Sequence, residues 1–92
     1  MLEKQVEAYL VKRVRELGGR VWKFTSPAQR GVADRLVVMP GGRVWFVEVK
    51  TLGGRLSPLQ REFMDECKRL GANYKIVWEK ADVDAFIATV SE

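Results

Sequence analysis

The sequence predicts an α/β fold with a mixed central sheet flanked by helices. Three stretches carry apolar residues at helical spacing, and short runs rich in β-branched and aromatic residues lie between them. Read along the chain, these segments give the order α-β-β-β-α-β-α. The chain has 92 residues, of which 47% are apolar, enough for one small core. We therefore expect residues 1–92 to form a single domain.

The first two elements have clear boundaries. A helix is expected over residues 3–17, because its apolar residues recur every three or four positions and Gly18-Gly19 can end it. The residues predicted to face the core are Val6, Leu10, Val14 and Leu17. A strand is expected over 20–25 (RVWKFT), followed by a loop over 26–32 that is rich in Ser, Pro and Gly.

The middle of the chain predicts a β-hairpin. Strands are expected over residues 35–39 (RLVVM) and 43–49 (RVWFVEV), and Pro40-Gly41-Gly42 is a turn signal between them. In an antiparallel pair with so short a turn, the numbers of facing residues sum to about 82 or 83. Asp34 should then lie opposite Glu48, or one step from it.

The last third predicts a helix, a strand and a helix. Ser57, Pro58 and Gln60 form a helix start with a capping box, after a flexible glycine loop over 52–56. This helix ends at Gly71, and its expected core face consists of Leu59, Phe63, Cys67 and Leu70. A buried strand is expected over 73–78 (NYKIVW). A final helix is expected over 81–90, and its inward residues are Val83, Phe86, Ile87 and Val90.

The composition excludes several classes of site. The chain has no histidine, which excludes Ser-His-Asp and Cys-His nucleophiles and histidine zinc sites. Its one cysteine, Cys67, excludes an internal disulfide, suits a reducing cytoplasm and is expected to be buried. Trp22, Trp45 and Trp78 fall in predicted strands, so we expect them to pack in the core rather than stack on bases. We see no membrane span and no signal-peptide pattern.

The hairpin carries the most informative polar residues. Glu48 and Lys50 are two apart, so they project from one face of their strand, and Asp34 approaches them across the pair. Two carboxylates this close repel each other unless a cation lies between them, and Mg²⁺ and Mn²⁺ prefer such oxygen ligands. The apolar run 44–47 predicts a central strand covered on both faces, where burying Glu48 costs free energy unless it is compensated. E-x-K alone is a weak signal, common at solvated strand ends.

The flanking motifs make the pattern specific. R-G-V-x-D, then E-V-K, then S-P-x-Q occur in this order over residues 30–60. In these motifs, and over nearly its whole length, the chain resembles the VRR-NUC domain of the PD-(D/E)xK nuclease superfamily. It departs from the family at Ala33, where proline is usual, and at Arg35, where an apolar residue is common. The resemblance implies a restriction-endonuclease-like core and Mg²⁺- or Mn²⁺-dependent hydrolysis of phosphodiester bonds in DNA.

The resemblance also implies roles for individual residues. Asp34, Glu48, the Val49 carbonyl and one glutamate of the first helix would hold the metal. Glu7 and Glu3 both remain candidates for that glutamate, and either can be a solvated helix charge. Lys50 would orient the attacking water or neutralise developing charge. Gln60 has two interpretations, as a capping-box residue or as a glutamine that contacts Lys50 or the scissile phosphate.

Charge and length bear on the partner. The net charge is +4 and the pI is near 9.5, which fits a polyanion, although ordinary solubility explains charge alone. The candidates for phosphate contact are Arg30, Arg35 and Arg55. Stand-alone domains of this family resemble Holliday-junction resolvases, so we expect a homodimer cutting branched DNA, with no nucleotide cofactor, in a bacterial or phage-infected cytoplasm. Two alternatives remain: a DNA-binding module with a decayed site, and a nuclease component targeted by a partner protein.

Overall fold

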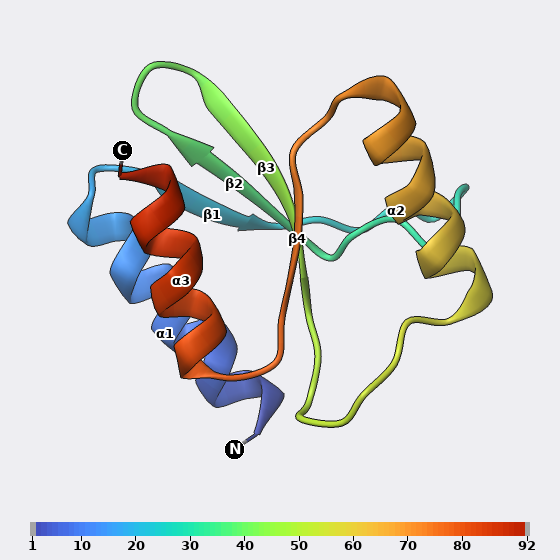
Figure 1. Ribbon diagram of the computed structural model, residues 1–92, viewed down its shortest axis with the longest axis horizontal. Coiled ribbons are helices and arrows are strands. Elements are labelled where there is room, and N and C mark those ends of the chain that lie inside the picture. The colour runs from blue at the N-terminus through green and yellow to red at the C-terminus, as the bar shows by residue number, and fades with distance from the viewer. Residues whose placement is uncertain (1, 92) are drawn as a thin grey trace.

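The computed structural model describes residues 2–91 and confirms the predicted order of elements (Figure 1). The elements, with their bounds, are α1 (Glu3–Glu16), β1 (Arg20–Lys23), β2 (Arg35–Met39), β3 (Arg43–Val49), α2 (Pro58–Leu70), β4 (Tyr74–Val77) and α3 (Lys80–Val90). Within residues 2–91, no helix has the length and apolar character that a membrane span requires.

The four strands form one mixed sheet in the order β1-β2-β3-β4. The first three strands are antiparallel, whereas β4 runs parallel to β3 because the chain crosses back through α2. In the hairpin, Arg35 pairs with Val47 and Met39 pairs with Arg43. The two residue numbers of each pair sum to 82, as the short turn between the strands predicts.

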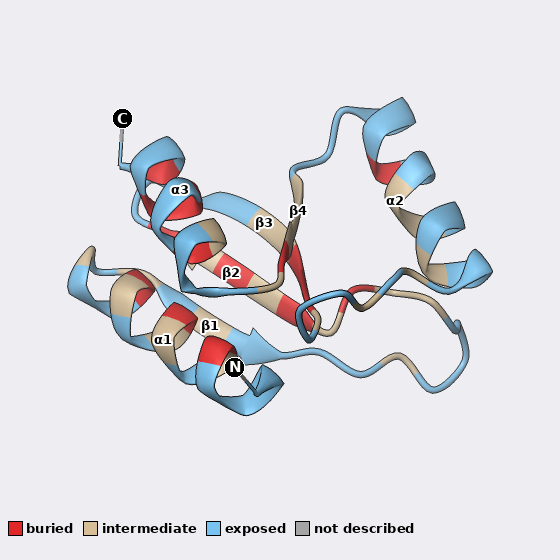
Figure 2. Ribbon diagram, turned by 60° about the horizontal axis from the view of Figure 1, so that its bottom comes forward, coloured by how far each residue is buried: buried red, intermediate tan, exposed pale blue. Residues whose placement is uncertain are grey.

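The main core lies on one face of the sheet, under α1 and α3. Figure 2 shows the buried residues of these two helices turned toward the strands. They pack against the β2, β3 and β4 residues whose side chains alternate onto the same face. The members of this core are Val6, Leu10, Val14, Val37, Met39, Val47, Val49, Val77, Val83, Phe86, Ile87 and Val90. The inward faces predicted for α1 and α3 are therefore confirmed, with Leu17 only half-buried at the end of α1.

The opposite face is covered only in part, by α2. The Phe63 ring packs edge-on against the Phe46 ring of β3, with centroids 5.2 Å apart. The centroid of the Tyr74 ring of β4 lies 6.1 Å from that of Phe63. Cys67 is buried, as expected. The prediction that Leu59 and Leu70 complete this core face is wrong, because they remain 43% and 68% exposed. Figure 2 shows most of α2 as exposed, so this helix rests on the sheet through a narrow line of contacts.

Exposure at the edges of the sheet corrects three further expectations. Trp22 of β1 is 45% exposed rather than packed in the core, because its side chain lies on the face of β1 opposite to Val21, which packs against the core. β4 is the other edge strand, so only Val77 in it is buried. The start of β3 is also open, since Val44 is exposed. Full cover of β3 begins only at Val47, close to Glu48.

The other two tryptophans are half-buried. Trp45 of β3 meets Phe86 of α3 edge-on, with ring centroids 5.2 Å apart. Trp78 lies directly after β4 rather than within it, and its Nε1–H donates a hydrogen bond of 2.8 Å to the carbonyl of Gly54. This bond ties the glycine loop that follows β3 to the end of β4.

Candidate active site

Asp34 and Glu48 lie next to each other where β2 begins and β3 ends. Continuing the hairpin register by one residue from Arg35–Val47 places Asp34 opposite Glu48. The Asp34 side chain reaches across the pair, and its Oδ1 accepts a hydrogen bond of 3.3 Å from the Val49 N–H. The Asp34 carbonyl accepts a bond of 2.9 Å from the Phe24 N–H. Hydrogen bonds from the residue after β1 and from the end of β3 therefore hold Asp34 in place.

The Glu48 carboxylate is buried and only partly satisfied. Its side chain is 3% exposed, and Oε1 has no hydrogen-bond partner among residues 2–91. Burial first, and then the negative charge of Asp34, raise the pKa of Glu48 to about 7, against the opposing effect of Lys50. A buried oxygen without a partner costs free energy, so this carboxylate is suited to a cation that would complete its coordination.

Lys50 follows β3 directly and remains close to Glu48. Its backbone N–H donates a bond of 2.9 Å to the Val77 carbonyl, which extends the parallel pairing of β3 and β4. Its positive charge acts on Glu48 by lowering the pKa of that carboxyl. The E-x-K spacing therefore places a cation and a buried carboxylate together at one strand end, as the sequence predicts.

Gln60 forms the predicted capping box, and its amide nitrogen also faces the candidate site, where it lies near Glu48. Its Oε1 accepts a bond of 2.8 Å from the Ser57 N–H, and its N–H donates to the Ser57 Oγ at 3.2 Å. The capping box at the start of α2 is therefore confirmed. The Gln60 Nε2 lies 3.5 Å from Glu48 Oε2, and is the donor in this long contact. The cap thus fixes the side chain that faces Glu48.

The glutamates of α1 border the same region. A hollow of about 510 Å³ lies between α1, the end of β1 and Asp34. Its lining residues are Glu3, Lys4, Glu7, Lys23, Phe24, Thr25, Asp34 and Arg35. Within residues 2–91, no three acidic or cysteine side chains are close enough together to hold a metal ion. The structure therefore brings Asp34 and Glu48 together, but leaves Glu3 and Glu7 at the rim of the hollow.

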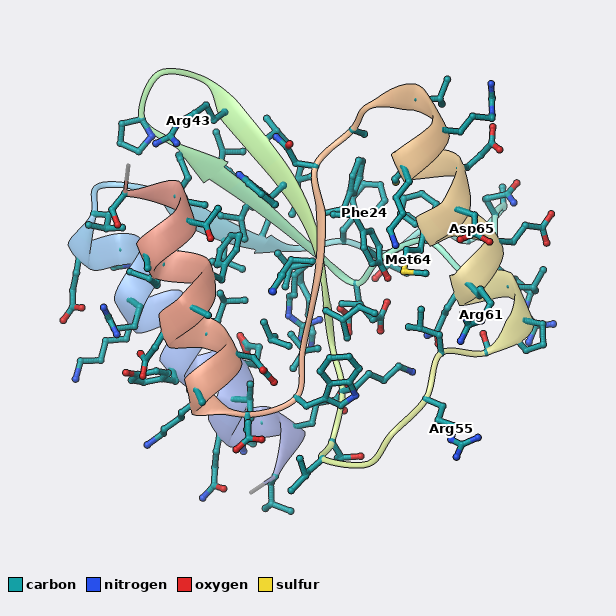
Figure 3. The ribbon with its side chains drawn as sticks, viewed as in Figure 1. Phe24, Arg43, Arg55, Arg61, Met64 and Asp65 are labelled. Carbon is teal, nitrogen blue, oxygen red and sulfur yellow. The ribbon has the colours of Figure 1, made fainter. Side chains whose placement is uncertain are left out.

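The three candidate arginines have different environments. Arg35 is 9% exposed, and its guanidinium lies 3.2 Å from Asp34 Oδ2. It does not lie on the surface as a phosphate contact requires, because it alternates with Val37 and Met39 onto the covered face of the sheet. Arg30 and Arg55 are exposed. Figure 3 shows Arg55 projecting outward from the loop that precedes α2.

Known proteins resemble this chain over most of its length. The family model of the VRR-NUC domain matches residues 3–81. The chain belongs to the VRR-NUC domain family. It is 38% identical over 89 residues to a protein of Acyrthosiphon pisum secondary endosymbiont phage 1 named "Putative nuclease p44", covering 97% of this chain and 95% of that one. It is also similar to a solved structure titled "VRR_NUC domain", with a TM-score of 0.88 and 34% identity over 94% of each chain.

Ala33, where this chain departs from the VRR-NUC pattern, precedes a residue that hydrogen bonds hold firmly. Ala33 is fully buried, and the residue after it is anchored by the hydrogen bonds to Phe24 and Val49 described above. Two strands therefore hold Asp34 in place without the usual proline.

Gly31 of the R-G-V-x-D motif has a structural role that sequence reasoning missed. It has a φ of +89°, and a Cβ at this position would overlap the carbonyl of Leu59 in the first turn of α2. Only glycine allows the loop before Asp34 to pack so closely against this helix. The signal was present in the sequence, because a glycine next to a site residue often marks such a close approach.

The residues of this VRR-NUC site fit a divalent cation. Nuclease domains of this kind generally use divalent metals. The two adjacent carboxylates and the unpaired Glu48 Oε1 supply the hard oxygen ligands that such ions require. The positive charge of the nearby Lys50 partly offsets the negative charges of the two carboxylates.

Proposed function

We propose that this protein is a metal-dependent, structure-specific endonuclease that hydrolyses phosphodiester bonds in DNA. The observation that carries the proposal is the buried Glu48 carboxylate, whose Oε1 has no partner among the described residues, next to Asp34. Membership of the VRR-NUC family and the nuclease name of the phage relative support it. An unpaired buried carboxylate is a costly feature that a purely structural or binding role does not explain.

The proposed ligands of Mg²⁺ or Mn²⁺ are Asp34, Glu48, the Val49 carbonyl and one glutamate of α1. Glu3 and Glu7 are both candidates for that glutamate, since both line the hollow that Asp34 borders. When bound, such a metal lowers the pKa of a coordinated water and stabilises negative charge on the phosphate.

The remaining side chains position the substrate and balance its charge. Lys50 orients the attacking water or neutralises charge that develops on the phosphate. Gln60 holds Glu48 through its Nε2 while the helix cap holds Gln60. Arg30 and Arg55 contact the DNA backbone on either side of the site. The net charge of +4 steers DNA toward this surface.

The proposed substrate is branched DNA, in particular a Holliday junction. A four-way junction needs two paired cuts, and a homodimer supplies two sites related by a two-fold axis. A chain of 92 residues has little surface for grasping branched DNA alone, which favours the dimer. The phage source of the p44 relative fits a protein that acts in the cytoplasm of a bacterium or a phage-infected host.

A substrate panel tests this proposal. Purified protein is incubated with linear, flap and four-way DNAs in Mg²⁺, Mn²⁺ or EDTA, and products are resolved on denaturing gels. We expect paired nicks in the four-way DNA that disappear in EDTA. Binding without metal-dependent cleavage would instead support a decayed site, and weak, indiscriminate nicking would support a component targeted by a partner.

Lys50→Ala separates the chemistry from the fold. We expect the variant to keep the melting temperature of the wild type, because Lys50 contributes to the sheet mainly through its backbone N–H. Cleavage should fall by at least about 100-fold, the range for loss of a group that stabilises charge in the transition state. Lys68→Ala, which removes an exposed lysine on α2, is the control for lost charge. Unchanged cleavage by Lys50→Ala would refute its assigned role.

A further inference from the structure

Trp22 is an exposed aromatic residue on an edge strand of a basic protein. It lies in the middle of β1, and 45% of it is accessible to solvent. Leaving so large an apolar ring in water forgoes burial energy that most tryptophans gain. A single exposed apolar side chain is common on protein surfaces, but Phe24, two residues further on the same side of the chain, is also 38% exposed, so the two rings form a larger apolar surface.

The surroundings of Trp22 are cationic. The guanidinium of Arg20 lies over the Trp22 ring, 5.0 Å from its centroid. Arg20 and Lys23 are both exposed, and neither forms an ion pair with any residue in the described range 2–91. A guanidinium stacked on a ring still presents its N–H groups at its edge, where a phosphate can accept from them. Lys23 projects from the opposite face of β1, toward the hollow that α1 borders, so Arg20 is the cation beside the ring. The ring and this guanidinium together match a nucleotide, which has an aromatic base and an anionic backbone.

This cationic surface is continuous with the candidate active site. Phe24 is two residues beyond Trp22 on the same side of the chain, is also exposed, and lines the hollow that Asp34 borders. Figure 3 shows Phe24 on the side of the strands where α2 lies. Trp22 faces Leu36, and Leu36 faces Phe46, so Trp22 shares its sheet face with Glu48, two residues after Phe46.

The spacing suits a short stretch of nucleic acid. Two residues of a strand span about 7 Å, and stacked nucleotides are about 3.4 Å apart. A base stacked on Trp22 would therefore lie within a few nucleotides of a phosphate held beside Asp34. Only an unpaired base exposes its π-face to such a ring, because both faces of a base inside a duplex are covered by its neighbours.

We propose that Trp22, with Phe24 and Arg20, forms a stacking platform for an unpaired nucleotide of the DNA substrate next to the scissile phosphate. The proposal rests on DNA being the substrate, as proposed above. A second copy of the chain is a poorer occupant, since a two-fold contact centred here would bring Arg20 against Arg20 of the other copy. The platform would favour branched DNAs that carry unpaired bases beside the branch point, such as flaps and forks.

Binding measurements in EDTA test the platform without cleavage. Fluorescence anisotropy gives the Kd of the wild type and of Trp22→Ala for a blunt duplex, a forked duplex with unpaired arms, and a single strand. We expect Trp22→Ala to weaken binding to the forked and single-stranded DNAs by roughly ten-fold or more, and to the duplex by less than about two-fold. Trp22→Phe should keep most of the affinity, because it retains an aromatic face.

Leu70→Ala is the matched control, since it removes an exposed apolar side chain from α2 instead. It should bind all three DNAs as the wild type does. Equal binding of forked DNA by Trp22→Ala and wild type would overturn the proposal, and so would an equal loss for all three DNAs. A second measurement needs no variant: 5-bromodeoxyuridine in the unpaired arm should crosslink to the peptide carrying Trp22 on irradiation. Crosslinks found only elsewhere would also overturn it.

The platform and the nuclease fail in distinguishable ways. If the wild type binds unpaired DNA through Trp22 but never cleaves in Mg²⁺ or Mn²⁺, the platform stands and the nuclease proposal falls. If the wild type cleaves and Trp22→Ala binds and cuts forked DNA equally well, the nuclease stands and the platform falls.

Discussion

The carboxylate of Glu48 occupies surroundings that disfavour its charge. It is almost completely buried, one of its oxygens has no partner in the described part of the chain, and Asp34 adds a second negative charge close by. Its pKa of about 7 means that near neutral pH the metal-free protein holds Glu48 as a mixture of the neutral and charged forms. The burial that makes Glu48 suited to bind a cation therefore lowers the stability of the metal-free protein.

This burial predicts a pH-dependent effect of Glu48→Gln. Because the folded-state pKa is raised from 4.5 to about 7, the folded chain binds the proton more tightly than the unfolded chain does. Glu48 is therefore tolerated below pH 4.5 and becomes increasingly destabilising as the pH rises through 7. In EDTA, Glu48→Gln should match the wild type near pH 4.5 and exceed its free energy of unfolding by about 3 kcal/mol at pH 8. Urea unfolding at a series of pH values measures this difference.

Two controls sharpen the Glu48 measurement. Glu62→Gln removes an exposed carboxylate from α2 and reports the general effect of one lost negative charge. Saturating Mn²⁺ at pH 8 should narrow the gap, because a bound cation stabilises the charged wild-type carboxylate and adds stability only to the folded state. A stability difference that stays constant between pH 4.5 and 8 would show that burial of the Glu48 charge is not its cause.

At the level of single elements, the start of α2 joins a structural cap to the candidate site. Ser57 and Gln60 satisfy each other's backbone N–H groups, and the remaining amide nitrogen of Gln60 faces Glu48. The side-chain cap at the start of α2 therefore also orients Gln60 toward Glu48. The sequence motif S-P-x-Q encodes both functions in four residues.

A pair of variants separates the two roles of Gln60. Ser57→Ala removes the Oγ that accepts from the Gln60 N–H and leaves the Glu48 contact possible, whereas Gln60→Ala keeps that bond and removes both the acceptor of the Ser57 N–H and the Glu48 contact. Each should lower the free energy of unfolding by about 1 kcal/mol, the usual cost of a lost N-cap interaction. Only Gln60→Ala should also lower the rate of cleavage in Mg²⁺ under saturating DNA. Equal loss of activity in the two variants would mean that Gln60 acts only through the helix end.

The β2–β3 hairpin and helix α2 show which features of the structure could be predicted from the sequence. The register of the hairpin followed from the short Pro40-Gly41-Gly42 turn, because local geometry leaves few alternatives, and it placed Asp34 beside Glu48 correctly. The exposed positions of Leu59 and Leu70 did not follow from periodicity. Periodicity shows which residues share a helix face, but the area offered by the sheet opposite is a tertiary property. The same limit explains why Trp22 was expected in the core.

At the scale of the whole molecule, the two faces of the sheet have different tasks. Packing by α1 and α3 builds a closed core on one face, whereas α2 leaves much of the other face open (Figure 2). Glu48, Gln60 and Trp22 all belong to the open side. Stability is concentrated away from the site, which leaves the surface near Glu48 accessible to a large substrate. The roles of Glu3 and Glu7 depend on this global arrangement, so no local pattern could decide between them.

This asymmetry predicts unequal costs for two similar substitutions. Phe86→Ala removes a ring that is 1% exposed and packs against Trp45 on the closed face. It should cost about 3–5 kcal/mol, the range for a buried phenylalanine, and so remove much of the stability of a small domain, typically about 5–15 kcal/mol. Phe63→Ala removes a half-buried ring that α2 packs against the sheet. It should cost clearly less, because water already reaches part of this ring.

Urea unfolding of the two phenylalanine variants at pH 6 measures both costs on one scale. Leu70→Ala serves as the baseline, since its exposed side chain should contribute less than about 0.5 kcal/mol. The expected ranking of destabilisation is Phe86→Ala, then Phe63→Ala, then Leu70→Ala. If Phe63→Ala destabilised the protein as much as Phe86→Ala, α2 would be as strongly packed as α1 and α3. The open face would then be a closed core, and the site beside Glu48 would have to be reached from the α1 side alone.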